Sequence, residues 1–203
     1  MRENAYRVYD ISQEVFHCVV FPGDPKPECQ VLNTMETGDL YNLTAFSMCS
    51  HNGTHIDAPR HFVQDGATID QIPLTKTIGF CYVAEHRGEL GADHAREILA
   101  RAASACPAAA EKILIKGDAF VSEAAAEVFA AAGVDLVGNE SQTVGPEKAP
   151  MQVHLILLHA EVVLLEGIRL GEVPEGVYWL HAAPICLGGA EGAPCRATLT
   201  TIK

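Results

Sequence analysis

Short apolar runs separated by glycine, proline and polar residues recur along this chain, and they predict a protein rich in strands. The stretch Pro-Gly-Asp-Pro-Lys-Pro at 22–27 breaks the chain sharply after the first two runs. The runs are enriched in β-branched and aromatic residues, as strands are. Strands are expected at 6–11, 15–21, 30–32, 41–48, 79–84, 112–116, 134–137, 162–165, 177–180 and 196–202.

Helices are expected between some of these strands. Asp93 is placed to cap a helix that runs to about residue 103. Ser122 opens an alanine-rich helix that Gly133 is placed to end. The run 151–159 fits either a helix or a strand. The alternation of both element types indicates the α/β class.

The composition favours one folded domain that spans residues 1–203. Hydrophobic residues make up 48% of the chain, enough for a sizeable core, and the formal net charge is −12. That charge repels nucleic acids and anionic membranes, so neither is expected as a partner. No segment resembles a secretory signal or is apolar enough to cross a bilayer, which predicts a cytoplasmic protein.

The seven cysteines include no Cys-x-x-Cys pair. Their spacing matches neither a zinc ribbon nor a compact disulfide framework. Most of them are therefore expected to be buried and reduced. Cys49 with His51 as its base is an alternative nucleophile, which we rank below a buried thiol.

The densest polar motif lies at residues 51–62, with the sequence His-Asn-Gly-Thr-His-Ile-Asp-Ala-Pro-Arg-His-Phe. His51, His55, Asp57 and His61 all occupy odd positions, so an extended chain would turn them to one face. Imidazole and carboxylate ligands suit a divalent metal, with zinc expected first and manganese or iron as alternatives. A histidine left out of the ligand set can move protons at neutral pH. A turn whose histidines cap backbone groups is the competing interpretation.

The string His-x-Gly-Thr-His-x-Asp-Ala-Pro-x-His-Phe resembles the signature of the cyclase family of metal-dependent hydrolases, which includes bacterial kynurenine formamidases and isatin hydrolases. Three weaker matches stand in the family's order along the chain: 10–12 followed by 21–24, His154 followed by 163–167, and 189–197. The resemblance covers nearly the whole chain. It implies a swivelling β/β/α-type α/β fold, with a mixed sheet and flanking helices.

The resemblance also implies a role for each matching residue. His61 matches the catalytic acid/base, and Phe21 stands where formamidases place an aromatic residue, usually Trp, against the substrate ring. His159 competes with His154 as a ligand, but the spacing of His154 to Glu166 fits the family. The implied ligands for one or two divalent ions are His51, His55, Asp57, His154 and Glu166.

The implied activity is hydrolysis of an amide or cyclic amide in a small-molecule substrate, with metal-activated water as the nucleophile. Phe21 in place of Trp, and a loop at 138–143 without the family's Asp-rich pattern, leave the substrate open. An aryl formamide such as N-formylkynurenine competes with a cyclic amide such as isatin. A non-catalytic, metal-stabilised binding protein on the same scaffold is the other alternative. The resemblance further implies a homodimer or higher homo-oligomer.

Overall fold

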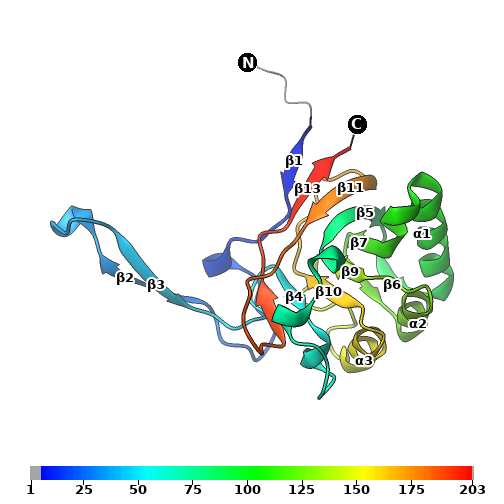
Figure 1. Cartoon of the computed structure of the whole chain (residues 1–203), viewed down its shortest axis with the longest axis horizontal. Helices are drawn as coiled ribbons and strands as arrows, with labels where there is room; N and C mark the ends of the chain where they lie inside the picture. The colour runs from blue at the N-terminus through cyan, green and yellow to red at the C-terminus, as the bar shows by residue number, and fades with distance from the viewer. Residues whose placement is uncertain (1–5, 203) are drawn as a thin grey trace.

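One curled sheet of nine strands organises the computed structural model, which describes residues 6–202 (Figure 1). Four central strands, β5, β7, β9 and β10, run parallel, and the strands on either side pair antiparallel. The strand order is β1 (Val8–Asp10), β13 (Thr198–Thr201), β11 (Gly176–His181), β5 (Ile78–Glu85), β7 (Lys112–Lys116), β9 (Leu136–Asn139), β10 (Val163–Glu166), β4 (His55–Asp57) and β12 (Gly192–Pro194).

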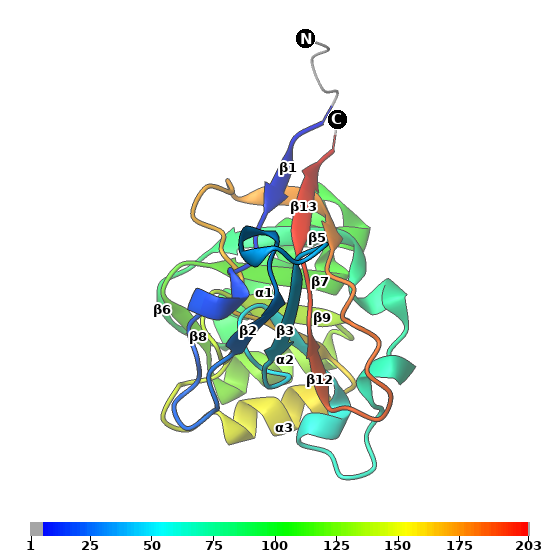
Figure 2. The same ribbon diagram turned by 90° about the vertical axis from the view of Figure 1, so that its left-hand side faces the viewer.

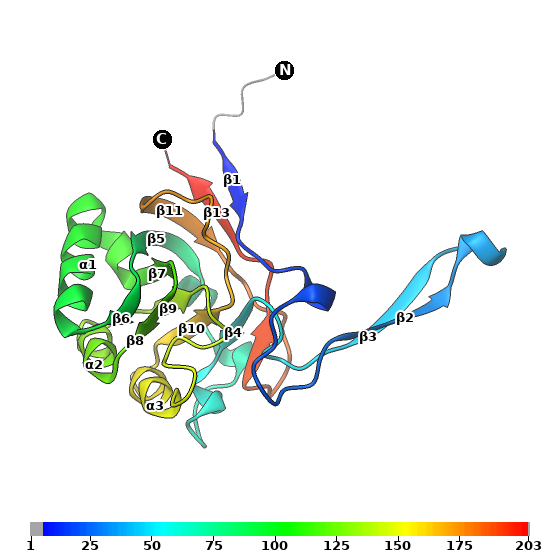
Figure 3. The same cartoon turned by 180° about the vertical axis from the view of Figure 1, so that it is seen from behind.

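Three α-helices connect the parallel strands and lie together beside the sheet (Figure 3). A parallel pair needs such a crossover, which explains their placement. They are α1 (Ala92–Ala105), α2 (Glu123–Ala131) and α3 (Met151–His159), so the run 151–159 is a helix. Strands β6 (Gly88–Leu90) and β8 (Ala119–Val121) form a small separate parallel sheet. The predicted α/β class, with a mixed sheet and flanking helices, is confirmed.

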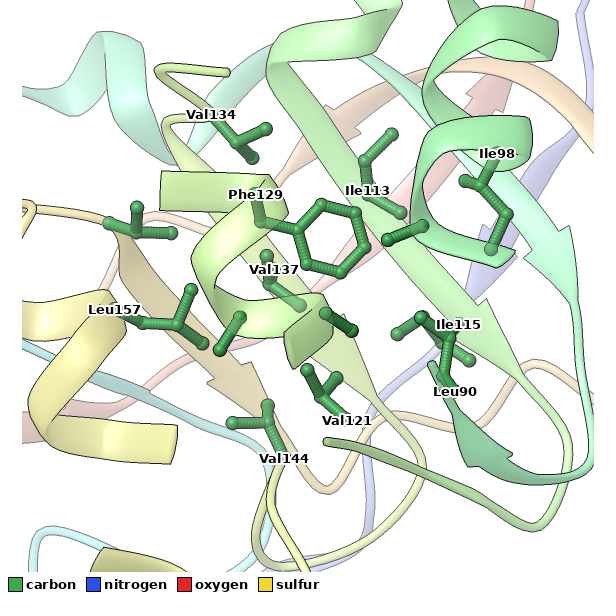
Figure 4. Close-up of a cluster of buried hydrophobic side chains, with 14 of the residues drawn as sticks. Leu90, Ile98, Ile113, Ile115, Val121, Phe129, Val134, Val137, Val144 and Leu157 are labelled. Atoms are coloured by element: carbon green, nitrogen blue, oxygen red, sulfur yellow. The ribbon is translucent and has the colours of Figure 1, made fainter. Parts of the chain in front are cut away.

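Both faces of the central strands are buried. In β7, Ile113 and Ile115 pack in one cluster with Phe129 of α2, on the side of the helices (Figure 4). Leu114 packs in a second cluster, because successive side chains of a strand point to opposite faces. A strand covered on both faces has an apolar middle, here Ile113 to Ile115 between two lysines, which is why this segment was recognisable in the sequence.

A hairpin of β2 (Glu28–Asn33) and β3 (Leu43–Ser47) extends away from the sheet and comes toward the viewer in Figure 2. Its apolar side chains are exposed, including Val31 at 63%, Leu40 at 93% and Phe46 at 60%. A two-stranded hairpin is at best marginally stable in water by itself.

Two predicted elements differ from the structure. The strand at 15–21 is wrong, because Val15–His17 form a 3-10 turn in which the N–H groups of Phe16 and His17 donate to the Glu14 carboxylate. A side chain that caps a turn in this way competes with strand pairing. Helix α1 begins earlier than expected, with Gly91 rather than Asp93 at its N-cap. The other predicted strands are confirmed, the one at 112–116 with its predicted bounds and the rest with shifted boundaries.

The cysteine prediction is correct in one respect and wrong in another. All seven thiols are free, but only Cys81 is buried. Cys29 is exposed because it lies on the projecting hairpin, and Cys186 is exposed in a loop. Within residues 6–202, no helix is both long and apolar enough to span a membrane.

Candidate metal centre

Strands β4 and β10 place three of the predicted ligands on one face of the sheet. Glu166 of β10 lies directly opposite His55 of β4 in the antiparallel register. Opposite residues of such a pair share a face, and so do residues two apart along a strand. His55, Glu166 and Asp57 therefore converge, and all three are buried.

The three other histidines come from outside these strands. His154 lies on α3, His51 lies in the turn before β4, and His61 ends the 3-10 turn Pro59–His61. The prediction of one extended chain is therefore wrong beyond β4, because Pro59 starts that turn and the segment before β4 bends. The histidines still meet, since the bends bring them back toward Asp57.

Asp57 is the centre of the cluster. Its Oδ1 lies 2.9 Å from Nδ1 of His51 and 3.3 Å from Nε2 of His55. Its Oδ2 lies 3.7 Å from Nε2 of His154 and 3.9 Å from Nε2 of His61. One buried carboxylate is thus surrounded by four imidazoles.

Glu166 forms a second anionic point beside it. Its Oε1 accepts the backbone N–H of Val144 at 2.7 Å and lies 3.2 Å from Nε2 of His154. Its Oε2 lies 3.5 Å from Nε2 of His55. His159, the rival of His154, is exposed at the end of α3.

Backbone carbonyls orient two of the imidazoles. Nδ1 of His55 lies 3.1 Å from the Gly53 carbonyl, and Nδ1 of His154 lies 2.9 Å from the Pro150 carbonyl. Each Nδ1–H donates to its carbonyl, so in the neutral ring Nε2 carries the lone pair. Both Nε2 atoms face the carboxylates. This is how proteins commonly orient histidines that ligate metals.

The donor set fits a divalent cation. Among residues 6–202, Nε2 of His55 and Oδ2 of Asp57 are buried without a hydrogen-bond partner. Leaving such atoms unpaired is costly, and a cation between them removes the cost. Donor atoms within 4.8 Å of one another form two groups that share Asp57: one with His51 and His61, the other with His55 and Glu166.

The carboxylates determine how the imidazoles hold protons in the metal-free protein. Burial opposes the charged form of His55, but its interactions with Asp57 and Glu166 outweigh burial and raise its pKa to about 10. Burial likewise opposes charge on His154, yet Glu166 raises its pKa to about 9. Burial lowers the pKa of His61 below its usual value. His61 is therefore neutral at pH 7, whereas His55 and His154 are charged until a cation replaces their protons.

A cavity of about 240 Å³ opens onto the cluster. Phe21 and Phe62 lie on its wall, so the predicted substrate-contact residue borders the same space as the ligands. Phe62 also packs against His154, with 4.9 Å between the centroids of the two rings. Cys49 is not among the lining residues, and burial raises the pKa of its thiol, which disfavours it as a nucleophile.

Comparison with known proteins relates this arrangement to a family. Residues 9–146 match the model of the Cyclase family, described as "Putative cyclase". The kynurenine formamidase of Sphingopyxis alaskensis is 32% identical over 210 residues, which cover 97% of this chain and 99% of that protein. The chain belongs to the Cyclase family. This cyclase-family chain shares its fold with an isatin hydrolase solved with the product analogue thioisatinate, at TM-score 0.84 and 18% identity over 98% of this chain and 93% of that one.

A second solved structure, of a predicted metal-dependent hydrolase from Bacillus stearothermophilus, is 28% identical to this cyclase-family chain. It has a TM-score of 0.78 and covers 97% of this chain and 98% of its own.

Sequence reasoning missed one member of the site, Glu191, whose Oε1 lies 3.2 Å from Nε2 of His51. The available signal was weak: one acidic residue in a glycine- and alanine-rich segment before the last strands.

Proposed function

We propose that this chain is a divalent-metal-dependent hydrolase that cleaves the amide C–N bond of an aryl formamide of the N-formylkynurenine type. The single observation that supports it best is the pair of buried carboxylates, Asp57 and Glu166, set among four imidazoles beside a cavity of about 240 Å³. The similarity to a kynurenine formamidase over nearly the full length supports the substrate class.

The proposed ligands are His51, His55, Asp57, His154 and Glu166. Asp57 belongs to both groups of neighbouring donors, so it is the proposed bridge if two ions bind. Zinc is the first choice for imidazole and carboxylate ligands, with manganese or iron as alternatives. When bound, the metal supplies a Lewis acid for the scissile carbonyl and lowers the pKa of water.

His61 is proposed as the acid/base. At 27% exposure of its side chain it is the most accessible of the four imidazoles. Its Nε2 lies 3.9 Å from Oδ2 of Asp57, beyond hydrogen-bond distance, whereas Nδ1 of His55 and of His154 each bond to a backbone carbonyl. Its lowered pKa leaves Nε2 ready to accept a proton at neutral pH and to return it to the leaving nitrogen.

Phe21 and Phe62 are proposed to hold the aromatic ring of the substrate. Both line the cavity, and aromatic side chains favour edge or offset contacts with such rings. A cyclic amide such as isatin is the second candidate, because an isatin hydrolase has this fold. Turnover of both compounds, followed by absorbance, separates the two substrates.

The test begins with metal analysis and the activity of the purified chain. His154→Ala is expected to lose metal and turnover, whereas His159→Ala, an exposed histidine of the same helix, retains both. Full activity of a metal-free protein, or of the variants His55→Ala and Asp57→Ala, would refute the proposal. Metal binding without turnover on any amide, ester or lactone would favour a non-catalytic binding protein.

We further propose that the enzyme is a homodimer in the cytoplasm. A second, largely apolar cavity of about 600 Å³ lies at the base of the β2–β3 hairpin, lined by Phe16, Phe46, Met48 and Ile185 among others. A second copy of the chain that covers this cavity and the hairpin would bury their apolar surface. The free thiols agree with a reducing compartment. Light scattering of the parent protein is expected to give twice the monomer mass. The variant Phe46→Asp is expected to give the mass of one monomer.

A further inference from the structure

We propose that Glu191 is a positioning residue of the metal centre, which holds the imidazole of His51 so that Nδ1 faces Asp57. The inference rests on the proposed metal-binding function and adds a residue to it. Nε2 of His51 lies 3.2 Å from Oε1 of Glu191, on the side of the ring away from the cluster. Nδ1 lies 2.9 Å from Oδ1 of Asp57.

This contact selects the tautomer of His51. The carboxylate of Glu191 can only accept, so Nε2–H donates to it and Nδ1 keeps the lone pair. His55 and His154 have the opposite arrangement, with Nδ1–H bonded to a backbone carbonyl and Nε2 facing the carboxylates. Each proposed histidine ligand thus has an acceptor on its outer nitrogen, and only His51 has a charged one.

Ser50 holds the Glu191 carboxylate in turn. Its hydroxyl donates to Oε1 of Glu191 at 2.5 Å, the same oxygen that faces His51. The backbone carbonyl of Glu191 accepts the N–H of Ala58 at 2.9 Å, next to Asp57. Both ends of Glu191 are therefore tied to the segment that carries the ligands.

Gly192, the residue after Glu191, lies close to the imidazole ring of His51. Gly192 of β12 lies opposite Asp57 of β4, and a Cβ added to it would lie 2.9 Å from Cε1 of His51. The added Cβ would also lie 2.9 Å from the Ile56 carbonyl oxygen, and no ordinary Cβ approaches other atoms so closely, so glycine leaves the space that the His51 ring and this carbonyl occupy. Both residues therefore position His51. Glu191 accepts a hydrogen bond from its ring, and Gly192 leaves the space that the ring occupies.

The experiment measures Zn²⁺ affinity of the full chain by competition with a chromophoric chelator. Glu191→Gln, close in shape, and Glu191→Ala are each expected to weaken Zn²⁺ binding by about 10–100-fold, the usual effect of losing a carboxylate behind a histidine ligand. Glu172→Gln is the matched control, since Glu172 is exposed and far along the chain from the motif. The visible spectrum of the Co²⁺-loaded protein should change in the Glu191 variants and not in the control.

The outcomes separate this inference from the proposed function. Wild-type Zn²⁺ affinity and Co²⁺ spectrum in Glu191→Gln and Glu191→Ala, with binding abolished in His55→Ala, would overturn the role of Glu191 and leave the metal centre intact. A parent chain that binds no Zn²⁺ would overturn both. The thermal midpoint of each metal-free variant should equal that of the parent, and a large fall in both Glu191 variants would assign Glu191 a purely structural role.

Discussion

Loading the metal-free protein with Zn²⁺ should release at least two protons per chain at pH 7. The perturbation is the displacement of the protons that His55 and His154 carry while they face Asp57 and Glu166 without a cation. Their pKa values are about 10 and about 9, so both rings are protonated at pH 7. Zinc binds only the neutral ring.

The free energy needed to remove these protons depends on how far the two pKa values lie above the working pH. At pH 7, removing the proton costs about 4 kcal/mol for His55 and about 3 kcal/mol for His154. The apparent affinity for Zn²⁺ should therefore rise by about a hundredfold for each pH unit gained below the lower of the two pKa values. The gain per unit shrinks once the pH passes the pKa of His154.

In contrast to the affinity for Zn²⁺, the stability of the metal-free fold should fall as the pH rises. Both histidines have folded-state pKa values above their unfolded value, so they contribute stability that is complete below about pH 6.5. That contribution is lost as the pH rises through 9 and then 10. Urea unfolding of the metal-free protein should show a lower free energy of unfolding at alkaline pH.

Calorimetry in two buffers with different ionisation enthalpies measures the protons released. His154→Gln removes a proposed ligand and should abolish the release together with Zn²⁺ binding, whereas His159→Gln, at the exposed end of the same helix, should leave both unchanged. A release of fewer than about one proton per chain, or an affinity that does not change with pH, would refute this account of the site.

Three further perturbations test other parts of the structure. His61→Gln should lower kcat by about 10²–10⁴-fold while the metal content stays constant; loss of metal would instead make His61 a ligand. Gly167→Ala should lower the free energy of unfolding in urea by about 2–4 kcal/mol, because φ is +69° and the new Cβ would collide with the Gly53 carbonyl. The control Gly171→Ala should not show this loss, because its new Cβ has no atom within 4 Å. Phe129→Ala should cost about 3–5 kcal/mol of unfolding free energy, since its side chain is fully buried between the helices and the sheet; a loss below 1 kcal/mol would contradict that packing.

The sequence by itself determined the local structure and the nature of the chemistry. Ser122 caps α2 as expected, with its hydroxyl accepting the N–H of Ala125, because capping depends only on neighbours along the chain. Residues 112–116 form strand β7 as expected, because Ile113, Leu114 and Ile115 are the short apolar run of a strand buried on both faces. The motif at 51–62 contained the residue types of a metal site, and the family resemblance named its distant partners.

The tertiary structure decided how distant residues reach that motif. Glu166 reaches His55 through the register of β10 on β4, and His154 reaches Glu166 because α3 packs beside the same strands. Glu191 escaped prediction because the family match at 189–197 assigned no role to any single residue, and the pairing of β12 with β4 brings Glu191 to His51. Local propensity acts over a few residues, whereas strand register and helix packing join segments about a hundred residues apart, so the finished site is a property of the fold.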